Sequence, residues 1–206
     1  QAAYWMGQNG FFVYDGRVQP LRSAVGDFIF ENLNVSQRSK VVGVLNSQFS
    51  EVVWFYPSTG STENDSYVSY NYMEGHWQVG TLSRTAGFDT GTFVYPNYVD
   101  ATGIIYEHEA GYAYDSDTEV FAESGPIQLG NGDRMMVAKS LIPDEKTQGE
   151  VTATFKTRFF PNGTESSFGP FDMANPTSVR FQGRQVQMRI TGNTAASWRV
   201  GTMRLD

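Results

Sequence analysis

Short runs of apolar and aromatic residues follow one another along the whole chain, and turn-forming residues separate them. The aromatic run at 11–14 lies between Asn9-Gly10 and Asp15-Gly16, dipeptides that suit the positive φ angles of hairpin turns. Further runs of this kind lie at 41–45, 51–56, 67–72, 76–79 and 103–106. This rhythm of short strand, tight turn and short strand predicts an antiparallel meander, as in a propeller blade or a sandwich.

Longer strands are predicted towards the C-terminus. From Val151 to Phe159 every second residue belongs to one face and the residues between them are polar or charged, which is typical of a half-buried antiparallel strand. A last strand is predicted to begin at Trp198 and Val200.

The apolar phase changes between two of these C-terminal runs. Val179 and Phe181 share one phase, whereas Val186 and Met188 have the opposite one. Because a slip of one residue moves every later side chain to the other face, we predict a β-bulge or a sharp bend at Gly183. Gly183 is then needed for its conformational freedom if the backbone there has a positive φ.

Only the segment 34–40 has the features of a helix, with Asn34 or Ser36 as its N-cap, so helix content below ~10% is expected. The predicted fold is therefore all-β: an antiparallel meander of β-propeller blades over 1–125, followed by a smaller antiparallel β-sandwich-like domain over 126–206. A propeller closes with several blades of ~40–45 residues, and 1–125 holds two or three at most. We expect further blades to precede Gln1 or to come from another chain.

Composition agrees with this fold and limits the chemistry. Aromatic residues make up 15% of the chain and there are 21 glycines, which favour pleated strands and the turns between them. The absence of cysteine excludes disulfides and thiolate metal sites, and no apolar run approaches the ~20 residues of a transmembrane helix.

The charge is unevenly divided. Residues 1–130 carry 5 basic and 15 acidic side chains, a balance of -10, whereas residues 131–206 carry 10 and 7, a balance of +3. Gripping a phosphate backbone needs clustered Lys and Arg, so nucleic-acid binding of the usual kind is not expected.

Motifs for catalysis are missing. The sequence has no serine nucleophile elbow, no P-loop and no dinucleotide fingerprint. Its histidines are His76 and His108, and strand alternation places Glu107 and Glu109 on the face opposite His108, which makes a metal site from that triplet awkward. We therefore expect no enzyme, no catalytic residue, no cofactor and no resident metal.

Two other functions remain as alternatives, one catalytic and one of ligand binding. A glycosidase would need a carboxylate pair, and the acidic residues between Asp100 and Glu123 are candidates for it. Aromatic residues could instead form a sugar-binding platform, although such side chains at strand spacing more often pack in a core. The aromatic candidates are Tyr67, Tyr70, Tyr72, Trp77 and Tyr95.

Several short segments together resemble one protein family. They are Tyr4-Trp5-Met6-Gly7 through Phe11-Phe12-Val13-Tyr14-Asp15-Gly16, the stretch from Leu45 to Pro57, Tyr67 to Tyr72, Trp77 to Thr85, Gly183 to Ile190 and Trp198 to Leu205. These phrases are similar to segments of the tail hub or nozzle proteins of short-tailed bacteriophages, which are also called packaged-DNA stabilisation proteins.

The resemblance implies a structural virion protein of a phage tail with a β-propeller body. Its partners would be copies of itself in a ring, expected as a hexamer, with adaptor or portal-side tail proteins and tail fibre or spike proteins. Such a ring extends the DNA channel, retains the packaged DNA and passes it during ejection without sequence-specific binding. No catalytic residue carries over from this family. The alternative is a carbohydrate-binding or glycoside-cleaving β module.

The acidic stretch is the candidate functional feature under this interpretation. Seven carboxylates and no Lys or Arg lie between Asp100 and Glu123, and Asp115, Asp117 and Glu119 alternate within it. We predict that these three side chains face the channel, where like charge keeps DNA mobile. A solvated acidic loop and a cluster of oxygen ligands for calcium are the alternatives.

Overall fold

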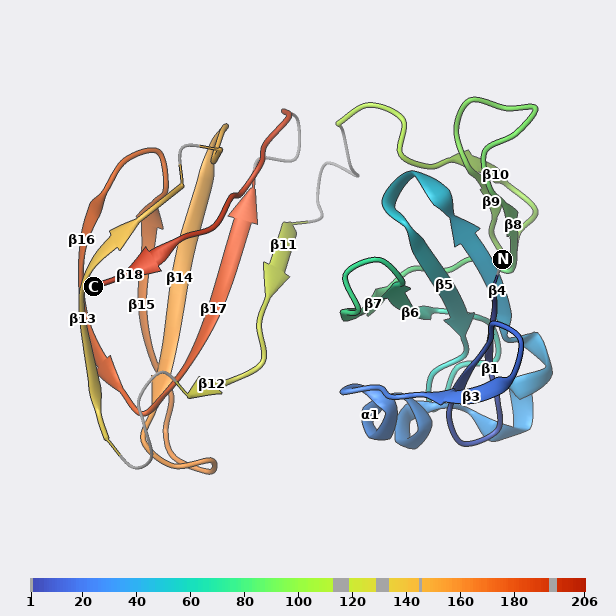
Figure 1. Ribbon diagram of the computed structural model, residues 1–206, viewed down its shortest axis with the longest axis horizontal. Helices are drawn as coiled ribbons and strands as arrows, with labels where there is room; N and C mark the ends of the chain where they lie inside the picture. Colours follow the sequence, from blue (N-terminus) through green and yellow to red (C-terminus); the bar gives the residue numbers. More distant parts are fainter. Residues whose placement is uncertain (1, 113–118, 129–133, 145, 193–195) are drawn as a thin grey trace. The chain divides into compact units, whose positions relative to one another are not determined.

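The chain folds as an all-β protein with antiparallel sheets. The computed structural model describes residues 2–112, 119–128, 134–144, 146–192 and 196–206 (Figure 1). Strands take up 48% of the chain and helices 8%, so the predicted fold class and low helix content are confirmed. The residues form two compact units, 1–110 and 111–206. This division precedes β11 (Val120–Glu123), which belongs to the C-terminal unit because it pairs with β17 (Gln185–Gly192).

A four-stranded meander forms the centre of the N-terminal unit. Each strand pairs with the next one in the sequence, in the order β4-β5-β6-β7. The strands are β4 (Val42–Asn46), β5 (Glu51–Tyr56), β6 (Ser66–Asn71) and β7 (Trp77–Thr81), close to the predicted runs. The strand β5 is buried on both faces beyond Glu51, so the meander is an inner layer.

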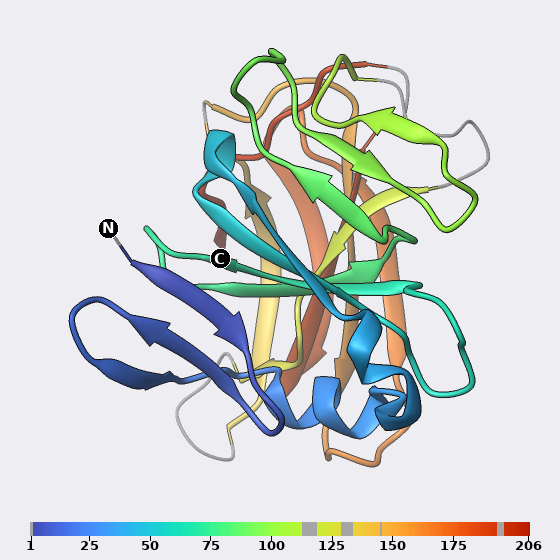
Figure 2. The ribbon, with the colours of Figure 1, turned by 90° about the vertical axis from the view of Figure 1, so that its right-hand side faces the viewer.

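Smaller sheets cover the two faces of this meander. The strands β1 (Ala3–Met6), β2 (Phe11–Tyr14) and β3 (Val18–Leu21) form one sheet, and β8 (Ala86–Phe88), β9 (Asn97–Val99) and β10 (Ile105–Glu107) form the other. The blue strands β1–β3 and the green strands β8–β10 lie on opposite sides of the meander (Figure 2). Phe11 and Trp54 belong to the core on the first side, and Phe55 and Tyr98 to the core on the second.

Helices are short and connect the sheets. The predicted segment 34–40 forms the 3-10 helix η1 (Val35–Lys40), where the Asn34 side chain accepts a hydrogen bond from the Ser36 backbone N–H at 3.2 Å. A 3-10 turn, η2 (Ser47–Phe49), joins β4 to β5. The expectation of a single helical segment is wrong, because α1 (Gly26–Asn32) precedes η1. Its N-cap residue Val25 offers no side-chain cap, and the helix instead buries Ile29 in the first core.

The C-terminal unit is a sandwich of two antiparallel sheets, as predicted. One sheet holds β11, β17, β14 (Val151–Arg158) and β15 (Ser166–Asp172) in that order, with β12 (Ile127–Gln128) also on β17. The other holds β16 (Thr177–Gly183), β13 (Met136–Ile142) and β18 (Arg204–Leu205). Buried side chains of both sheets, including Phe155 and Phe181, form one core between them.

Strand β14 has the predicted alternation, with Val151, Ala153, Phe155 and Thr157 buried. Its predicted end is wrong, because Phe159 follows the strand and is 41% exposed. The last strand also begins later than predicted, at Arg204, and Arg199 makes only an isolated bridge to Gln148.

The chain changes sheet at Gly183, so the predicted sharp bend is confirmed. The strand β16 ends at Gly183, a bend follows at Arg184, and β17 begins at Gln185 in the opposite sheet. The change of apolar phase therefore reflects the passage from one sheet to the other. Gly183 does not have a positive φ, and the structure requires a glycine there for a different reason.

A substitution at Gly183 is expected to destabilise the sandwich by steric contact. A Cβ atom there would lie 2.8 Å from Cβ of Thr157, which is buried. We expect Gly183→Val to cost about 1–3 kcal/mol, as other overpacked cores do, measured by chemical denaturation. Gly125→Val is the matched control, since nothing lies within 4 Å of a Cβ at Gly125. Equal denaturation midpoints for the two variants would contradict the close approach of the Gly183 backbone to the Thr157 side chain.

Candidate functional site

Of the three acidic residues predicted to face a channel, the structure describes only Glu119. Asp115 and Asp117 lie outside the described residues, and Glu119 directly precedes the strand β11. The Glu119 carboxylate forms an ion pair with the Arg189 guanidinium and accepts a hydrogen bond from Thr191 Oγ1 at 3.3 Å. Its charge is therefore compensated within the chain. A position facing a channel stays a prediction.

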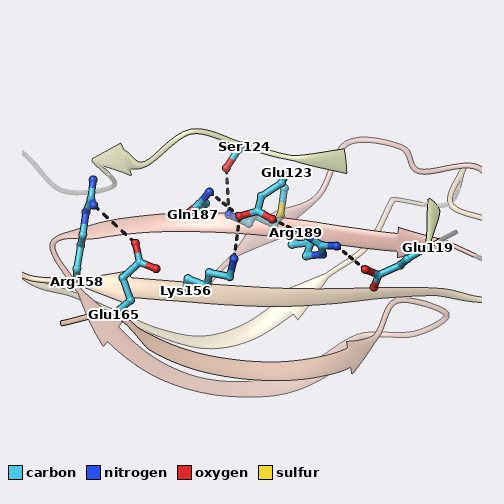
Figure 3. A network of polar contacts seen from close by, with 9 residues as sticks. Glu119, Glu123, Ser124, Lys156, Arg158, Glu165, Gln187 and Arg189 are labelled. Carbon is cyan, nitrogen blue, oxygen red and sulfur yellow. Dashed lines mark hydrogen bonds and ion pairs between the residues drawn. The ribbon is translucent and has the colours of Figure 1, made fainter. Parts of the chain in front are cut away.

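A second carboxylate of β11, Glu123, is the centre of a polar network (Figure 3). Its oxygens accept hydrogen bonds from Lys156 Nζ at 2.9 Å, Gln187 Nε2 at 2.6 Å and Arg189 Nη1 at 2.8 Å. The donors lie on β14 and β17, at positions that alternate with the core residues of those strands. The hydrogen bond from Lys156, followed by that from Arg189, holds the pKa of Glu123 below its usual value.

The network continues along the same face of the sheet. The Arg189 guanidinium lies 3.6 Å from the centre of the Phe121 ring, and Arg158 donates to Gln185 Oε1 at 2.9 Å and pairs with Glu165 at 3.6 Å. Three carboxylates thus face three cations: Glu119, Glu123 and Glu165 against Lys156, Arg158 and Arg189. With its charges paired, the network is suited to hold β11 on the sheet.

Removal of the Glu123 carboxylate is expected to destabilise the C-terminal unit. The side chain is 17% exposed, and its loss leaves two cations without this acceptor. We expect Glu123→Ala to cost about 1–3 kcal/mol in a denaturant titration at pH 7. Because the pKa is lower in the folded state, this contribution is present above the unfolded pKa and is lost as the pH falls through the folded one.

Glu165→Ala is the matched control for Glu123→Ala. Glu165 is 45% exposed and makes one longer ion pair, at 3.6 Å to Arg158. Exposed pairs of this kind contribute about 0–1 kcal/mol. Equal losses of stability in the two variants would mean that the hydrogen bonds to Glu123 contribute nothing beyond its charge.

Another polar group lies in the N-terminal unit, between the meander and the segment after β10. Asn46 stands directly opposite Glu51 in the β4–β5 register. The Asn46 amide donates to Glu109 Oε1 at 3.1 Å, and Gln78 Nε2 donates to Glu51 Oε1 at 3.1 Å. Burial raises the pKa of both carboxyls, and the charge of Glu109 raises that of Glu51 further. These two acids are brought together from distant parts of the sequence.

His108 packs beside this group without joining it. Arg84 Nε donates to His108 Nε2 at 2.9 Å, the Tyr98 ring lies 4.2 Å away, and burial followed by the charge of Arg84 lowers the pKa of His108 to about 4. The expected alternation of Glu107, His108 and Glu109 does not hold, because β10 ends at Glu107 and Glu109 has a φ of 60°. Among the described residues, no three or more His, Cys, Asp or Glu side chains could hold a metal ion together.

The remaining candidates have local structural roles. Asp100 accepts a hydrogen bond from the Thr102 hydroxyl at 2.7 Å, which together with backbone donors lowers the pKa of Asp100 to about 2. Four of the five predicted platform aromatics pack against the cores of the N-terminal unit: Tyr67, Tyr70, Tyr72 and Trp77. Tyr95 is 37% exposed.

No helix within the described ranges is long and apolar enough to cross a membrane. When the chain is compared with known proteins, no protein-family model and no curated protein matches it.

Proposed function

We propose that the protein is a structural subunit of a phage tail hub or nozzle, in which copies of the chain form a ring around the DNA channel. The proposal rests on the exposed apolar side chains of the β8–β10 sheet, on the face that points away from the meander. Phe88 and Ile105 are 48% and 66% exposed on it, while Tyr98 of the same sheet is buried against the meander. A sheet with apolar side chains on both faces is suited to lie between two layers of protein.

The order of the sheets supports a propeller-like body. Three consecutive antiparallel sheets pack face to face, with β1–β3 on one side of the meander and β8–β10 on the other. The meander has the four-stranded form of a propeller blade. The described residues close no ring of blades, and in the proposed assembly a neighbouring copy covers the outer face of β8–β10.

The charge of the chain supports the passage of DNA without binding. Residues 1–130 have a balance of -10, and a wall of this sign does not add the Lys–phosphate contacts that would retard a moving duplex. In the proposed ring, Asp115, Asp117 and Glu119 face the channel. Adaptor or portal-side proteins and fibre or spike proteins bind the ends of the ring, and the site of action is the virion tail.

Self-association of the purified chain tests the proposal. We expect mass photometry and electron microscopy to show closed rings, six-fold by the family resemblance, and Ile105→Lys to abolish them by placing a charge in the interface. Val18→Lys is the matched control, since Val18 is 64% exposed on β3 of the same unit. A chain that stays monomeric at high concentration, or equal loss of rings in both variants, would overturn the proposed interface.

A further inference from the structure

Four buried side-chain oxygen atoms in the N-terminal unit lack a hydrogen-bond partner among the residues that the structure describes. One is Asn64 Oδ1, in the loop before β6, where the amide nitrogen of Asn64 donates to the backbone carbonyls of Lys40 and Arg84. The other three are Asn46 Oδ1, Ser69 Oγ and Tyr98 Oη, in side chains that are 4%, 1% and 3% exposed. Buried polar groups are nearly always hydrogen-bonded, because leaving them unpaired costs the full free energy of desolvation. Three such atoms on one side of the meander point to a bound ligand.

The strand register places these atoms around the two carboxylates. Asn46 is opposite Glu51 in the register, and the nitrogen of the same amide bonds Glu109, so the side chain that carries Oδ1 neighbours both acids. Gln78 on β7 reaches across β6 to bond Glu51. Ser69 on β6 is the direct neighbour of Gln78 in the register, and its side chain therefore lies on the same face.

Tyr98 approaches the group from the covering sheet. Its ring packs against Phe55 at 5.7 Å between centroids, on the side of the meander that carries Glu51. Burial, followed by the charges of Glu109, Asp89 and Glu51, raises the pKa of Tyr98 to about 12. The hydroxyl is in its neutral form, and the ring that carries it lies 4.2 Å from the ring of His108, the neighbour of Glu109 in the sequence.

We propose that Glu51, Glu109 and Asn46 bind one calcium ion, with the hydroxyls of Ser69 and Tyr98 as further oxygen atoms of the site. Oxygen-only surroundings with carboxylate, amide and hydroxyl groups are the ligands that hard divalent cations take, and calcium accepts six to eight of them in flexible geometry. Two carboxylates carry the charge that balances a divalent ion. The ion links β5 to the segment after β10 and so fastens the covering sheet to the meander.

Calcium titration of the whole chain tests the site. After treatment with EDTA, we expect calcium at about 100-fold above its Kd to raise the Tm by about 5 °C or more. Three of the four tryptophans, Trp5, Trp54 and Trp77, lie in the N-terminal unit, so intrinsic fluorescence follows its unfolding. Terbium added in place of calcium should show luminescence sensitised by nearby aromatic rings, Tyr98 among them. Excess calcium should displace the terbium and abolish that signal.

Matched carboxylate variants separate the site from general charge effects. Glu109→Gln should abolish the terbium signal and the calcium shift, and it should not lower the Tm in EDTA because it removes a repulsion between buried acids. Glu107→Gln removes the same charge two residues away, from an exposed side chain, and should keep the full response. Glu51→Gln gives the same test should Glu109→Gln fail to fold.

Two results would overturn the proposal. One is a wild-type chain whose Tm and terbium luminescence do not respond up to about 10 mM calcium, beyond the weakest range for protein sites; ordered water would then satisfy the buried oxygens. The other is an equal loss of response in Glu107→Gln and Glu109→Gln.

Discussion

Truncation of Phe155 to alanine is expected to destabilise the C-terminal sandwich by about 3–5 kcal/mol, the range for large aromatic residues removed from packed cores. Phe155 is fully buried on β14 and stacks on Phe181 of the facing sheet with ring centroids 4.7 Å apart. The substitution would leave a cavity between the two sheets, in a core that side chains of both strands fill in the wild-type chain. Denaturant titration followed by circular dichroism measures the loss.

Phe160→Ala is the control for this prediction. Phe160 belongs to the same unit but is 67% exposed in the turn after β14. Its truncation should change the free energy of unfolding by no more than about 0.5 kcal/mol. If the two phenylalanine variants lose equal stability, Phe155 is not a core residue and the arrangement of the sandwich is wrong.

Trp54→Ala is expected to have an effect of similar size on the N-terminal unit. Trp54 is 3% exposed on β5, and its ring lies 5.1 Å from Phe11 and 6.1 Å from Trp77 between centroids. The ring also lies over Gly43, where a Cβ atom would be 3.1 Å from it, so the neighbouring strand offers no side chain to fill the cavity. We expect a loss of about 3–5 kcal/mol in thermal or chemical unfolding.

The control for Trp54 is another tryptophan of the same unit. Trp5 on β1 is partly buried and stacks on Phe12 at 5.6 Å, but it is not part of a core cluster. Trp5→Ala should therefore cost about 1 kcal/mol. A larger loss for Trp5 than for Trp54 would contradict this assignment. It would mean that the core of the unit lies on the face of the β1–β3 sheet that carries Trp5.

Strands with a clear local pattern could be predicted from the sequence. The strand β5 has its predicted bounds because the five residues from Val52 to Tyr56 all favour strands and are followed by Pro57, which cannot donate to a ladder. The burial of alternate residues on β14 follows directly from the period of two. The bend beside Gly183 was predictable for the same reason, although its cause, a change of sheet, needs the three-dimensional arrangement.

Features that depend on tertiary contacts could not be predicted. The helix α1 has seven residues and no capping side chain, and it is stabilised by the burial of Ile29. The carboxylates Glu51 and Glu109 meet only because the segment after β10 returns to the meander. One signal was available: Asn46 and Ser69 are polar residues at strand positions where the apolar alternation of β4 and β6 calls for a core residue.

The pairing of β17 has a consequence for synthesis of the chain. This strand is a partner of β11, β12 and β14, all of which precede it in the sequence. The ribosome adds about 5–20 residues per second, so β14 has a free edge for seconds, with Val151, Ala153 and Phe155 already on its apolar face. Such an edge is prone to aggregation. The meander β4–β7, in contrast, pairs each strand with the one made just before it, so nascent chains should misassemble mainly through the sandwich.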